Sequence, residues 1–337
     1  MKPRTVTQVS NHNSFGQVVA PNHKDFTIYE GDWGDYYAVR VEVWHKPIHG
    51  KAHKLMEKKL SDGRVDAVNI MSEHWEIYAD WNPWHGCTKI SPGCKYCYVY
   101  RQDEMYGSEI SSSECRKTAN FNLPVKRKRD KSWKIESGKL VFTCFTSDFL
   151  LKDADEWRSE CWQMMRQRSD LWFYFFTKRI DRFLECVPDD WDDGYDNVIV
   201  GCTVENQEMA DYRLPIFLSI PIKHKSIIAS PLISAIELTP YLDETIEEVS
   251  VGGESGVEAR PCDYDWVLSL REQCVSKDIP FRFHQTGAHF IKDGKMFRVK
   301  RCHQLSQAHK ANIDYKIGKY LVPETVKFEW KESDYHD

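Results

Sequence analysis

The sequence predicts an α/β protein whose core is a full or partial (β/α) barrel of about six to seven parallel strands. Short apolar runs rich in β-branched and aromatic residues follow one another along the chain. These runs are mostly apolar rather than strictly alternating, as expected of parallel strands that are covered on at least one face. Segments with helical periodicity follow several of them, and repeated strand–helix units favour a parallel sheet. A doubly wound sheet is the alternative.

The candidate strands end in polar residues, and a helical pattern often follows. They are expected at 77–83, 141–148, 171–179, 197–206, 226–231, 249–256 and 280–287. After Asp153, Trp157, Cys161 and Met164 recur at spacings of four and three, which predicts a helix. Asp263 is the expected N-cap of a later helix, because its side chain can accept a hydrogen bond from the helix start.

The two ends of the chain lack this rhythm. Residues 1–75 are expected to form an accessory element, with a strand pair or hairpin followed by a helix near 51–60. The barrel-like core then spans 76–287. A C-terminal extension over 288–337 should contain a hairpin that turns at Asp293-Gly294. The basic residues of that hairpin make it a candidate substrate contact.

Composition narrows the function classes. The 337 residues are 41% hydrophobic, so a sizeable core is expected. We see no apolar run long enough for a membrane span and no apolar signal-peptide core. The odd count of eleven cysteines argues against a disulfide framework, and we expect a cytoplasmic protein with reduced thiols and no membrane partner. A net charge of −5 argues against a globally basic nucleic-acid binder.

Charge is nevertheless uneven along the chain. From 116 to 134, eight Lys or Arg residues stand against one acid, Asp130. Such a run is either a solvated face or a contact for phosphates. The candidate contacts are Lys126, Arg127, Lys128 and Arg129. Because the run lies between a cysteine-rich loop and the second strand, we expect it near the mouth of the barrel.

The cysteine-rich loop is the strongest chemical signal. Cys87, Cys94 and Cys97 lie within eleven residues of a turn-prone segment that directly follows the first strand. Thiolates are soft ligands for zinc or an iron–sulfur cluster. Zinc would need His85 as a fourth ligand, only two positions before Cys87, and no second Cys-x-x-Cys pair occurs. A cluster held by three cysteines instead leaves one iron open for a substrate.

The motif "CKYC", with Tyr96 before the third cysteine, resembles the end of the radical S-adenosylmethionine (SAM) cysteine motif. Six residues instead of the usual three separate the first two cysteines. More closely, the chain resembles an uncharacterised family of phage and bacterial proteins named for a three-Cys motif. The matching stretches are "WNPWHGCTKISPGCKYCY", "FTSDF", "FFTKR", "GCTVENQEMADYRLP", "VGGESGVEARP" and "WVLSLREQC".

The resemblance implies a radical-SAM-like barrel with a 4Fe–4S cluster on the three cysteines, S-adenosylmethionine beside Tyr96, and a reductase or flavodoxin-type electron donor. Ser147 or Asp148, after the second strand, would accept a hydrogen bond from the methionine amine; alternatively Asp148 caps a helix. The Gly-Gly-Glu that ends at Glu254 falls after about the sixth strand. The usual amine role is therefore not transferred to it, and Glu254 is kept only as a general cofactor-binding candidate.

Polar residues after the later strands complete the candidate site. Glu205 and Asn206 would bind ribose hydroxyls or cap a helix. Lys178 and Arg179 would meet a carboxylate or a phosphate, and Gln285 would contact substrate. His284 and Lys178 are the candidate catalytic groups, although a core role for His284 is equally open.

Two functions are therefore expected to compete. The first is a radical SAM-like enzyme that abstracts hydrogen from a nucleic acid or nucleotide in modification or repair. The surplus of aromatic residues and the local basic runs support that substrate class. The second is a zinc-stabilised nucleic-acid-binding module without catalysis. A barrel that keeps the cluster and only senses redox state is a further alternative, and the oligomeric state is left open.

Overall fold

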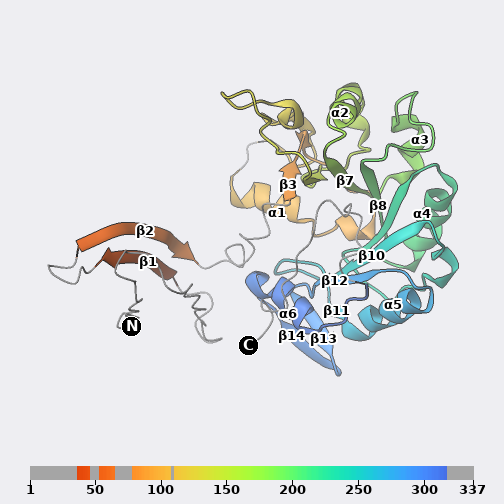
Figure 1. The fold of residues 1–337 in the computed structure, drawn as a ribbon. Helices are drawn as coiled ribbons and strands as arrows, with labels where there is room; N and C mark the ends of the chain where they lie inside the picture. The colour runs from red at the N-terminus through yellow and green to blue at the C-terminus, as the bar shows by residue number, and fades with distance from the viewer. Residues whose placement is uncertain (1–35, 46–52, 65–77, 108–109, 317–337) are drawn as a thin grey trace. The chain divides into compact units, whose positions relative to one another are not determined.

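A seven-stranded parallel sheet forms the core of the protein in the computed structural model (Figure 1). The structure describes residues 36–45, 53–64, 78–107 and 110–316. The chain divides into two compact units, residues 1–69 and 70–337, and each is described by itself.

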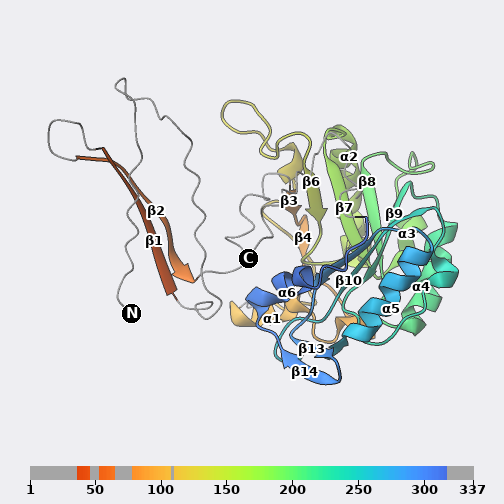
Figure 2. The same ribbon diagram turned by 60° about the horizontal axis from the view of Figure 1, so that its bottom comes forward.

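The strands of the sheet occur at the expected places. They are β3 (Tyr78–Trp81), β6 (Leu140–Thr143), β7 (Trp172–Thr177), β8 (Val198–Thr203), β9 (His224–Ala229), β10 (Ile246–Gly252) and β12 (Phe281–Gln285). Every neighbouring pair is parallel, and the order β12-β10-β9-β8-β7-β6-β3 follows the chain from one edge to the other. The sheet curls into a half-barrel (Figure 2). The predicted partial barrel is confirmed, because a doubly wound sheet would reverse its strand order at an internal switch point.

Helices cover the convex side of the sheet (Figures 1 and 2). They are α2 (Asp155–Gln167), α3 (Phe183–Cys186), α4 (Gln207–Ser219) and α5 (Tyr264–Ser276). The expected N-cap is confirmed, because the Asp263 side chain accepts a hydrogen bond from the Asp265 N–H at 3.0 Å. The main core fills the space between these helices and the sheet, with Phe173 and Phe175 of β7 buried in it.

The concave side of the sheet carries a smaller apolar cluster. Successive strand residues point to opposite faces, so Tyr174 lies on the side opposite Phe173 and Phe175. It is buried in a cluster made of Leu140, Tyr174, Ile199 and Ile228. Phe142, Trp172 and Phe176 pack on this cluster and are only partly buried. Aromatic side chains are therefore accessible inside the half-barrel.

Short elements surround the carboxyl ends of the strands. They are β4 (Trp84–His85), η3 (Pro92–Cys94), α1 (Tyr98–Met105), β5 (Arg116–Lys117), β11 (Cys262–Asp263), β13 (His289–Lys292), β14 (Lys295–Arg298), η8 (Arg301–His303) and α6 (Gln304–Lys310). The connections contain η4 (Leu123–Val125), η5 (Lys152–Ala154), η6 (Ile180–Arg182) and η7 (Thr239–Tyr241). The predicted hairpin at Asp293-Gly294 is confirmed: both residues have positive φ, as a type I′ turn requires, and β13 pairs antiparallel with β14.

The N-terminal unit corrects one expectation. β1 (Tyr36–His45) and β2 (His53–Arg64) form an antiparallel hairpin, but its second strand lies beyond the segment 36–50 in which a strand pair was expected, and the helix expected near 51–60 is wrong. In 53–64 the backbone N–H and C=O groups form hydrogen bonds with β1. In a helix the same groups would bond within the segment itself. The expected boundary after residue 75 lies outside the described residues. Among the described helices, none combines the length and the apolar character that crossing a bilayer requires.

Candidate functional site

The cysteine loop begins at Trp84, directly after β3, and ends at Cys97, where α1 starts. Gly86 fixes its path. This glycine has φ +96°, and a Cβ atom there would lie 2.1 Å from the carbonyl oxygen of Glu114. Its N–H donates to the Thr146 carbonyl at 3.2 Å, and the next N–H, of Cys87, donates to the Ser112 carbonyl at 2.9 Å. The backbone therefore holds Cys87 against the loop that follows β6.

All three cysteines of the loop are free thiols and partly buried. The pKa of Cys87 is raised to about 12, mainly by burial, with contributions from the charge of Asp148 and from the two other thiols, while Arg179 opposes the rise. Burial also raises the pKa of Cys97, with a further contribution from Cys94. The thiols thus lie close enough to influence one another. Cys87 and Cys97 are therefore protonated at neutral pH unless a metal replaces their protons on binding.

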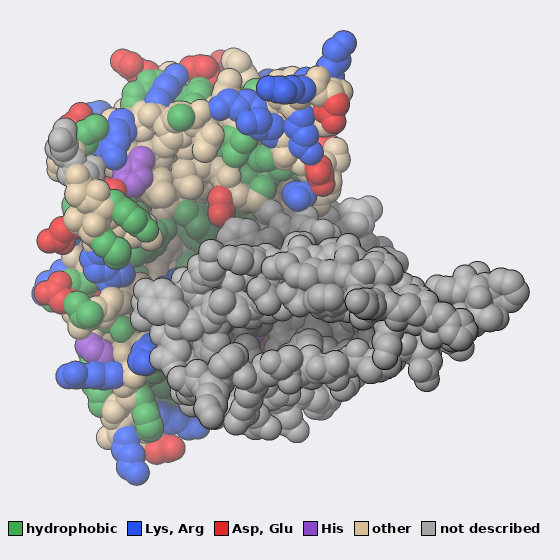
Figure 3. Space-filling view, turned by 90° about the vertical axis from the view of Figure 1, so that its left-hand side faces the viewer, with side chains coloured by type: hydrophobic (Ala, Val, Ile, Leu, Met, Phe, Trp, Pro, Cys, Tyr) green, Lys and Arg blue, Asp and Glu red, His purple; other side chains and the backbone are tan. Residues whose placement is uncertain are grey.

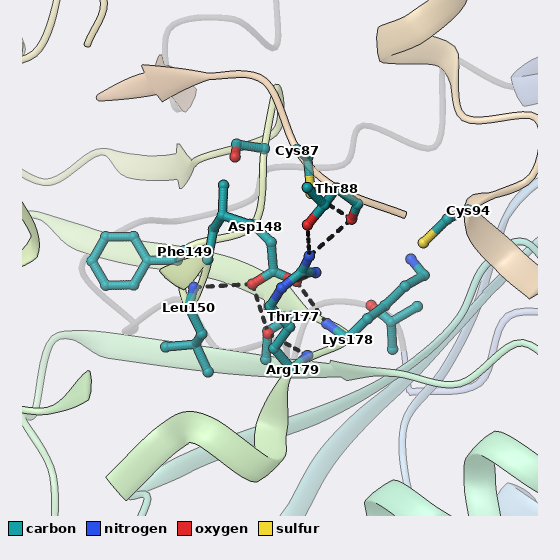
Figure 4. Close-up of polar contacts among 12 residues, drawn as sticks. Cys87, Thr88, Cys94, Asp148, Phe149, Leu150, Thr177, Lys178 and Arg179 are labelled. Carbon is teal, nitrogen blue, oxygen red and sulfur yellow. Dashed lines mark hydrogen bonds and ion pairs between the residues drawn. The ribbon is translucent and has the colours of Figure 1, made fainter. Parts of the chain in front are cut away.

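Arg179 ties the cysteine loop to the end of β7 (Figure 4). Its Nη2 donates to both the carbonyl and the hydroxyl oxygen of Thr88, each at 2.8 Å. Its Nη1 lies 3.6 Å from Asp148 Oδ2, and both side chains are only 8% exposed. A buried guanidinium that makes two hydrogen bonds to Thr88 restricts movement of the loop immediately after Cys87.

Asp148 joins the ends of β6 and β7. Its Oδ1 accepts from the Leu150 N–H at 3.0 Å and the Thr177 hydroxyl at 2.8 Å, and its Oδ2 accepts from the Lys178 N–H at 3.0 Å. These three hydrogen bonds and the ion pair with Arg179 engage both carboxylate oxygens. Asp148 therefore joins the ends of β6 and β7. The alternative in which it caps α2 is wrong, because Ala154 is the N-cap of that helix. The contact of Asp148 with the methionine amine stays a prediction. The hydroxyl of Ser147 is likewise engaged, because it donates to the Gly86 carbonyl.

Glu205 holds the turn between the first two cysteines. This carboxylate follows β8 and is completely buried. Its Oε1 accepts from the Gly93 N–H at 3.0 Å, and its Oε2 accepts from Arg213 Nη1 at 2.7 Å. Burial raises its pKa, but the charges of Arg213 and Lys178 and the hydrogen bonds of the turn outweigh this and lower it below the usual value. A Cβ at Gly93 would lie 2.9 Å from the Glu205 side chain, so a larger residue there would displace the carboxylate.

The loop after β10 contacts the other end of the cysteine loop. Glu254 accepts three hydrogen bonds from Arg260, from its N–H, Nε and Nη2, at 2.6–2.9 Å. The Arg260 guanidinium lies 5.5 Å from the centre of the Tyr96 ring. Arg101 of α1 donates to the hydroxyl oxygen of Ser255 at 2.9 Å and also to its carbonyl. Glu254 thus orients Arg260 beside the cysteine motif.

The remaining candidates fall into separate roles. Asn206 caps α4 by accepting from the Met209 N–H at 2.9 Å, so helix capping accounts for this residue. Gln285 donates to the Gly253 carbonyl at 2.7 Å. Hydroxyls of Ser250 and Ser230 lie 3.0 and 3.4 Å from the two ring nitrogens of His284. Burial lowers the pKa of His284 to about 3, so the ring is neutral at pH 7.

Lys178 is the available cation of the site. No hydrogen bond or ion pair of its ammonium group is found within the described ranges, whereas Arg179 beside it is fully engaged. Figure 4 shows the Lys178 side chain extending toward Cys94. Its charge reaches both Cys97 and Glu205, lowering the pKa of each. An anionic group that entered the site would meet this ammonium.

The run at 126–134, here named the basic hairpin, lies at the other end of the sheet, and its expected place at the barrel mouth is wrong. Arg168, just before β7, donates to the carbonyls of Pro124 and Ile135, which places the hairpin at the amino ends of the strands. The segment before the hairpin runs back along β3 from the cysteine-loop end of the sheet. On the way, Trp81 Nε1 donates to the Phe121 carbonyl at 2.9 Å. Figure 3 shows Lys and Arg side chains gathered at two opposite ends of this face.

Three of the four candidate cations of the basic hairpin also have partners within the chain. Lys126 donates to the Ala119 carbonyl at 2.7 Å, and Lys128 donates to Glu136 at 3.2 Å. Arg127 donates to the Lys131 carbonyl and lies 3.5 Å from the centre of the Trp133 ring. These contacts give the basic hairpin a structural role. Arg129, the fourth candidate cation, is exposed.

Zinc and a cluster are the two groups considered for the cysteine loop, and His85 is the residue that would distinguish them. His85, the expected fourth zinc ligand, holds its Nε2 2.8 and 2.9 Å from the carboxylate oxygens of Asp103. In the part of the chain that the structure describes, no three His, Cys, Asp or Glu side chains are grouped to share one metal ion. Both zinc and a cluster therefore stay predictions for this loop.

Sequence reasoning missed the three arginines that hold the loop. Arg213 lies nearly two turns into α4, Arg101 lies on α1, and Arg260 follows a glycine-rich turn. Each resembles an ordinary surface cation in the sequence. Only Arg260 had a signal, because it lies six residues after the noted Glu254.

Comparison with known proteins gives a family. A family model described as "Protein of unknown function (DUF5131)" matches residues 73–317, which is more than half of the chain. The chain therefore belongs to this family. No curated protein and no solved structure matches it. The family description names no activity, so the chemistry must be argued from the site.

Proposed function

We propose that the protein is a radical S-adenosylmethionine enzyme in which Cys87, Cys94 and Cys97 hold a 4Fe–4S cluster. One observation carries the proposal: three partly buried thiols lie on one loop at the carboxyl end of the first strand of a parallel half-barrel. When bound, such a cluster supplies one electron, drawn from a reductase or flavodoxin-type donor, that splits the sulfonium of S-adenosylmethionine so that a substrate C–H bond can be attacked.

The residues around the loop support this role by fixing its shape. Arg179 holds Thr88, Glu205 holds Gly93, and Arg260 lies beside Tyr96. These supports come from the carboxyl ends of three different strands, so the loop is attached at both sides of Cys94. A ligand site that is held before the metal arrives loses less conformational entropy on binding.

The available ammonium of Lys178 would bind an anionic group, either the carboxylate of S-adenosylmethionine or a substrate phosphate. His284 is neutral at pH 7 and would serve as a hydrogen-bonding group rather than as a cation. Glu254 and Glu205, first considered as direct cofactor contacts, would instead act by orienting Arg260 and the Gly93 turn.

We further propose a nucleic acid or nucleotide as the substrate, in a modification or repair reaction. The concave face supports this class because aromatic side chains are accessible on it. Phe145 lies 5.1 Å from Phe142 and 5.0 Å from Phe176, centroid to centroid, and all three rings are partly buried. Flat rings of this kind stack on nucleobases.

The test compares two cysteine variants after anaerobic reconstitution with iron and sulfide. Cys94→Ala should lose most of the iron and all formation of 5′-deoxyadenosine from S-adenosylmethionine and dithionite. Cys274→Ala, which removes a thiol from the core side of α5, is the matched control and should keep both. Full iron and full turnover in Cys94→Ala would exclude the proposed ligand set.

A further inference from the structure

The β13–β14 hairpin and the turn after it form a second cationic surface, here named the tail hairpin. Residues 292–301 contain five Lys or Arg and one acid, Asp293. All four residues of β14 are exposed, and Met296 and Phe297 keep 51% and 47% of their surface accessible. Within the described residues β14 pairs with β13 alone, so its outer edge is open.

The cations of the tail hairpin are available to a ligand. No hydrogen bond or ion pair of the Lys295, Arg298 or Lys300 side chains is found among the residues that the structure describes. The basic hairpin differs in this respect, since Lys126 and Lys128 are bound to groups of their own chain. Charge that is not neutralised internally attracts a polyanion.

The tail hairpin lies at the cysteine-loop end of the sheet. The Ala288 N–H donates to the Glu254 carbonyl at 2.8 Å, and the Val299 N–H donates to the Ala288 carbonyl at 2.8 Å. The base of the hairpin is thereby attached to the loop whose Arg260 lies beside Tyr96. The cationic surface therefore lies beside the loop that contacts the cysteine motif.

We propose that the tail hairpin binds a single-stranded nucleic acid and guides it to the cysteine loop. Lys295, Arg298 and Lys300 would contact phosphates, and Phe297 would stack on a base. The inference rests on the proposed function only in naming the substrate class of that enzyme. The binding itself requires no catalysis.

The pattern of side chains favours nucleic acid over an anionic membrane. Met296 and Phe297 are neighbours in a strand and point to opposite faces, as do Lys295 and Met296. No single face therefore gathers the apolar groups, as insertion into a bilayer requires. A flexible strand of nucleic acid lying along the open edge can use both faces at once.

Edge strands also carry lysines simply to prevent pairing with another sheet. That explanation does not account for the two large apolar side chains, whose exposure on an open edge promotes association instead. Their position between cations is the arrangement expected of a stacking platform with phosphate contacts.

The experiment measures fluorescence anisotropy of the full-length protein with labelled 12-nucleotide DNA and RNA strands of mixed sequence. Each phosphate contact on a single strand contributes about 0.7 to the slope of log K against log salt. Lys295→Gln/Arg298→Gln/Lys300→Gln should therefore lower that slope by about 2 and weaken binding on the order of 100-fold at 0.1 M salt. Phe297→Ala should weaken binding about tenfold and leave the slope unchanged.

The matched control is Lys126→Gln/Arg127→Gln/Lys128→Gln/Arg129→Gln, which removes four charges from the opposite end of the sheet. It should change affinity less than threefold, with circular dichroism confirming that both multiple variants are folded. Equal losses in the two variants would overturn the assignment, because the attraction would then be a general effect of charge.

Poly-glutamate and vesicles of phosphatidylserine and phosphatidylcholine test the other polyanions. Either one binding as tightly as the oligonucleotide, or no binding of any oligonucleotide by the wild-type chain, would overturn the inference. Iron content and cleavage of S-adenosylmethionine are measured separately on the same wild-type preparation. Cleavage without oligonucleotide binding would refute the tail hairpin alone, and binding without a cluster would refute the proposed enzyme alone.

Discussion

The contact between Glu205 and the cysteine loop gives a prediction that can be worked from its geometry. Glu205→Gln keeps the size of the side chain and removes its charge. Arg213 is only 2% exposed and lies 2.7 Å from the carboxylate, so the variant leaves a buried guanidinium without a counter-ion. Breaking a buried pair from one side costs about 3–5 kcal/mol. At about 2–4 °C per kcal/mol for a large domain, Tm should fall on the order of 10 °C.

The same substitution should loosen the turn at Gly93. Cys94 follows Gly93 directly, so alkylation of Cys94 by iodoacetamide, followed by mass spectrometry, should be several-fold faster in the variant. The matched control is Glu160→Gln, which removes an exposed ion pair with Lys117 and should cost less than about 1 kcal/mol.

A second variant isolates the charge. Glu205→Gln/Arg213→Met removes both partners and should recover most of the lost stability, because the unpaired guanidinium is gone. The lowered pKa of Glu205 gives the sign of the pH dependence. Its contribution is present above the unfolded pKa of about 4.3 and is lost as pH falls through the folded pKa. An unchanged Tm together with unchanged Cys94 alkylation would refute the reasoning.

Three further outcomes are expected. Gly86→Ala, at φ +96° and 2.1 Å from a carbonyl oxygen, should cost more than about 3 kcal/mol by denaturant titration, whereas Gly138→Ala, at φ +81° in open space, should cost about 1–2 kcal/mol. Burial raises the pKa of Glu248 to about 7, so the stability that this group contributes at low pH is lost as pH rises through 7. Glu248→Gln should therefore be more stable than wild type above pH 7. Burial lowers the pKa of His284 to about 3, so wild type should lose stability as pH falls from 6.5 toward 3, and His284→Asn should be flatter there; equal slopes would contradict burial of the ring.

The strands could be predicted because their sequence signal is local. Apolar runs such as Leu171–Phe176 predict a strand from their own residues alone, and the polar residues after them mark the carboxyl edge. The order of the strands also followed from the chain, since each crossover returns beside the previous strand. In contrast, 53–64 forms a strand only because β1 supplies its hydrogen bonds, which no local pattern shows.

The contacts of the site could not be predicted in the same way. Glu205 can be recognised in the sequence as a polar residue after a predicted strand. Its partners Gly93 and Arg213, however, lie 112 and 8 residues away along the chain. Similarly, the position of the basic hairpin depends on Arg168, which fastens the segment to the amino end of β7. Such polar contacts form only in the completed fold. The sequence can therefore predict which residues belong to the site, but not the role of each one.

The most direct test of the central claim is an anaerobic reconstitution of the wild-type chain. Iron, sulfide and zinc are counted, and S-adenosylmethionine is then added with dithionite. The account predicts about four irons per chain, the number in one 4Fe–4S cluster, together with 5′-deoxyadenosine. One tightly held zinc, no cluster and no cleavage would contradict it and leave the three cysteines as a structural clip.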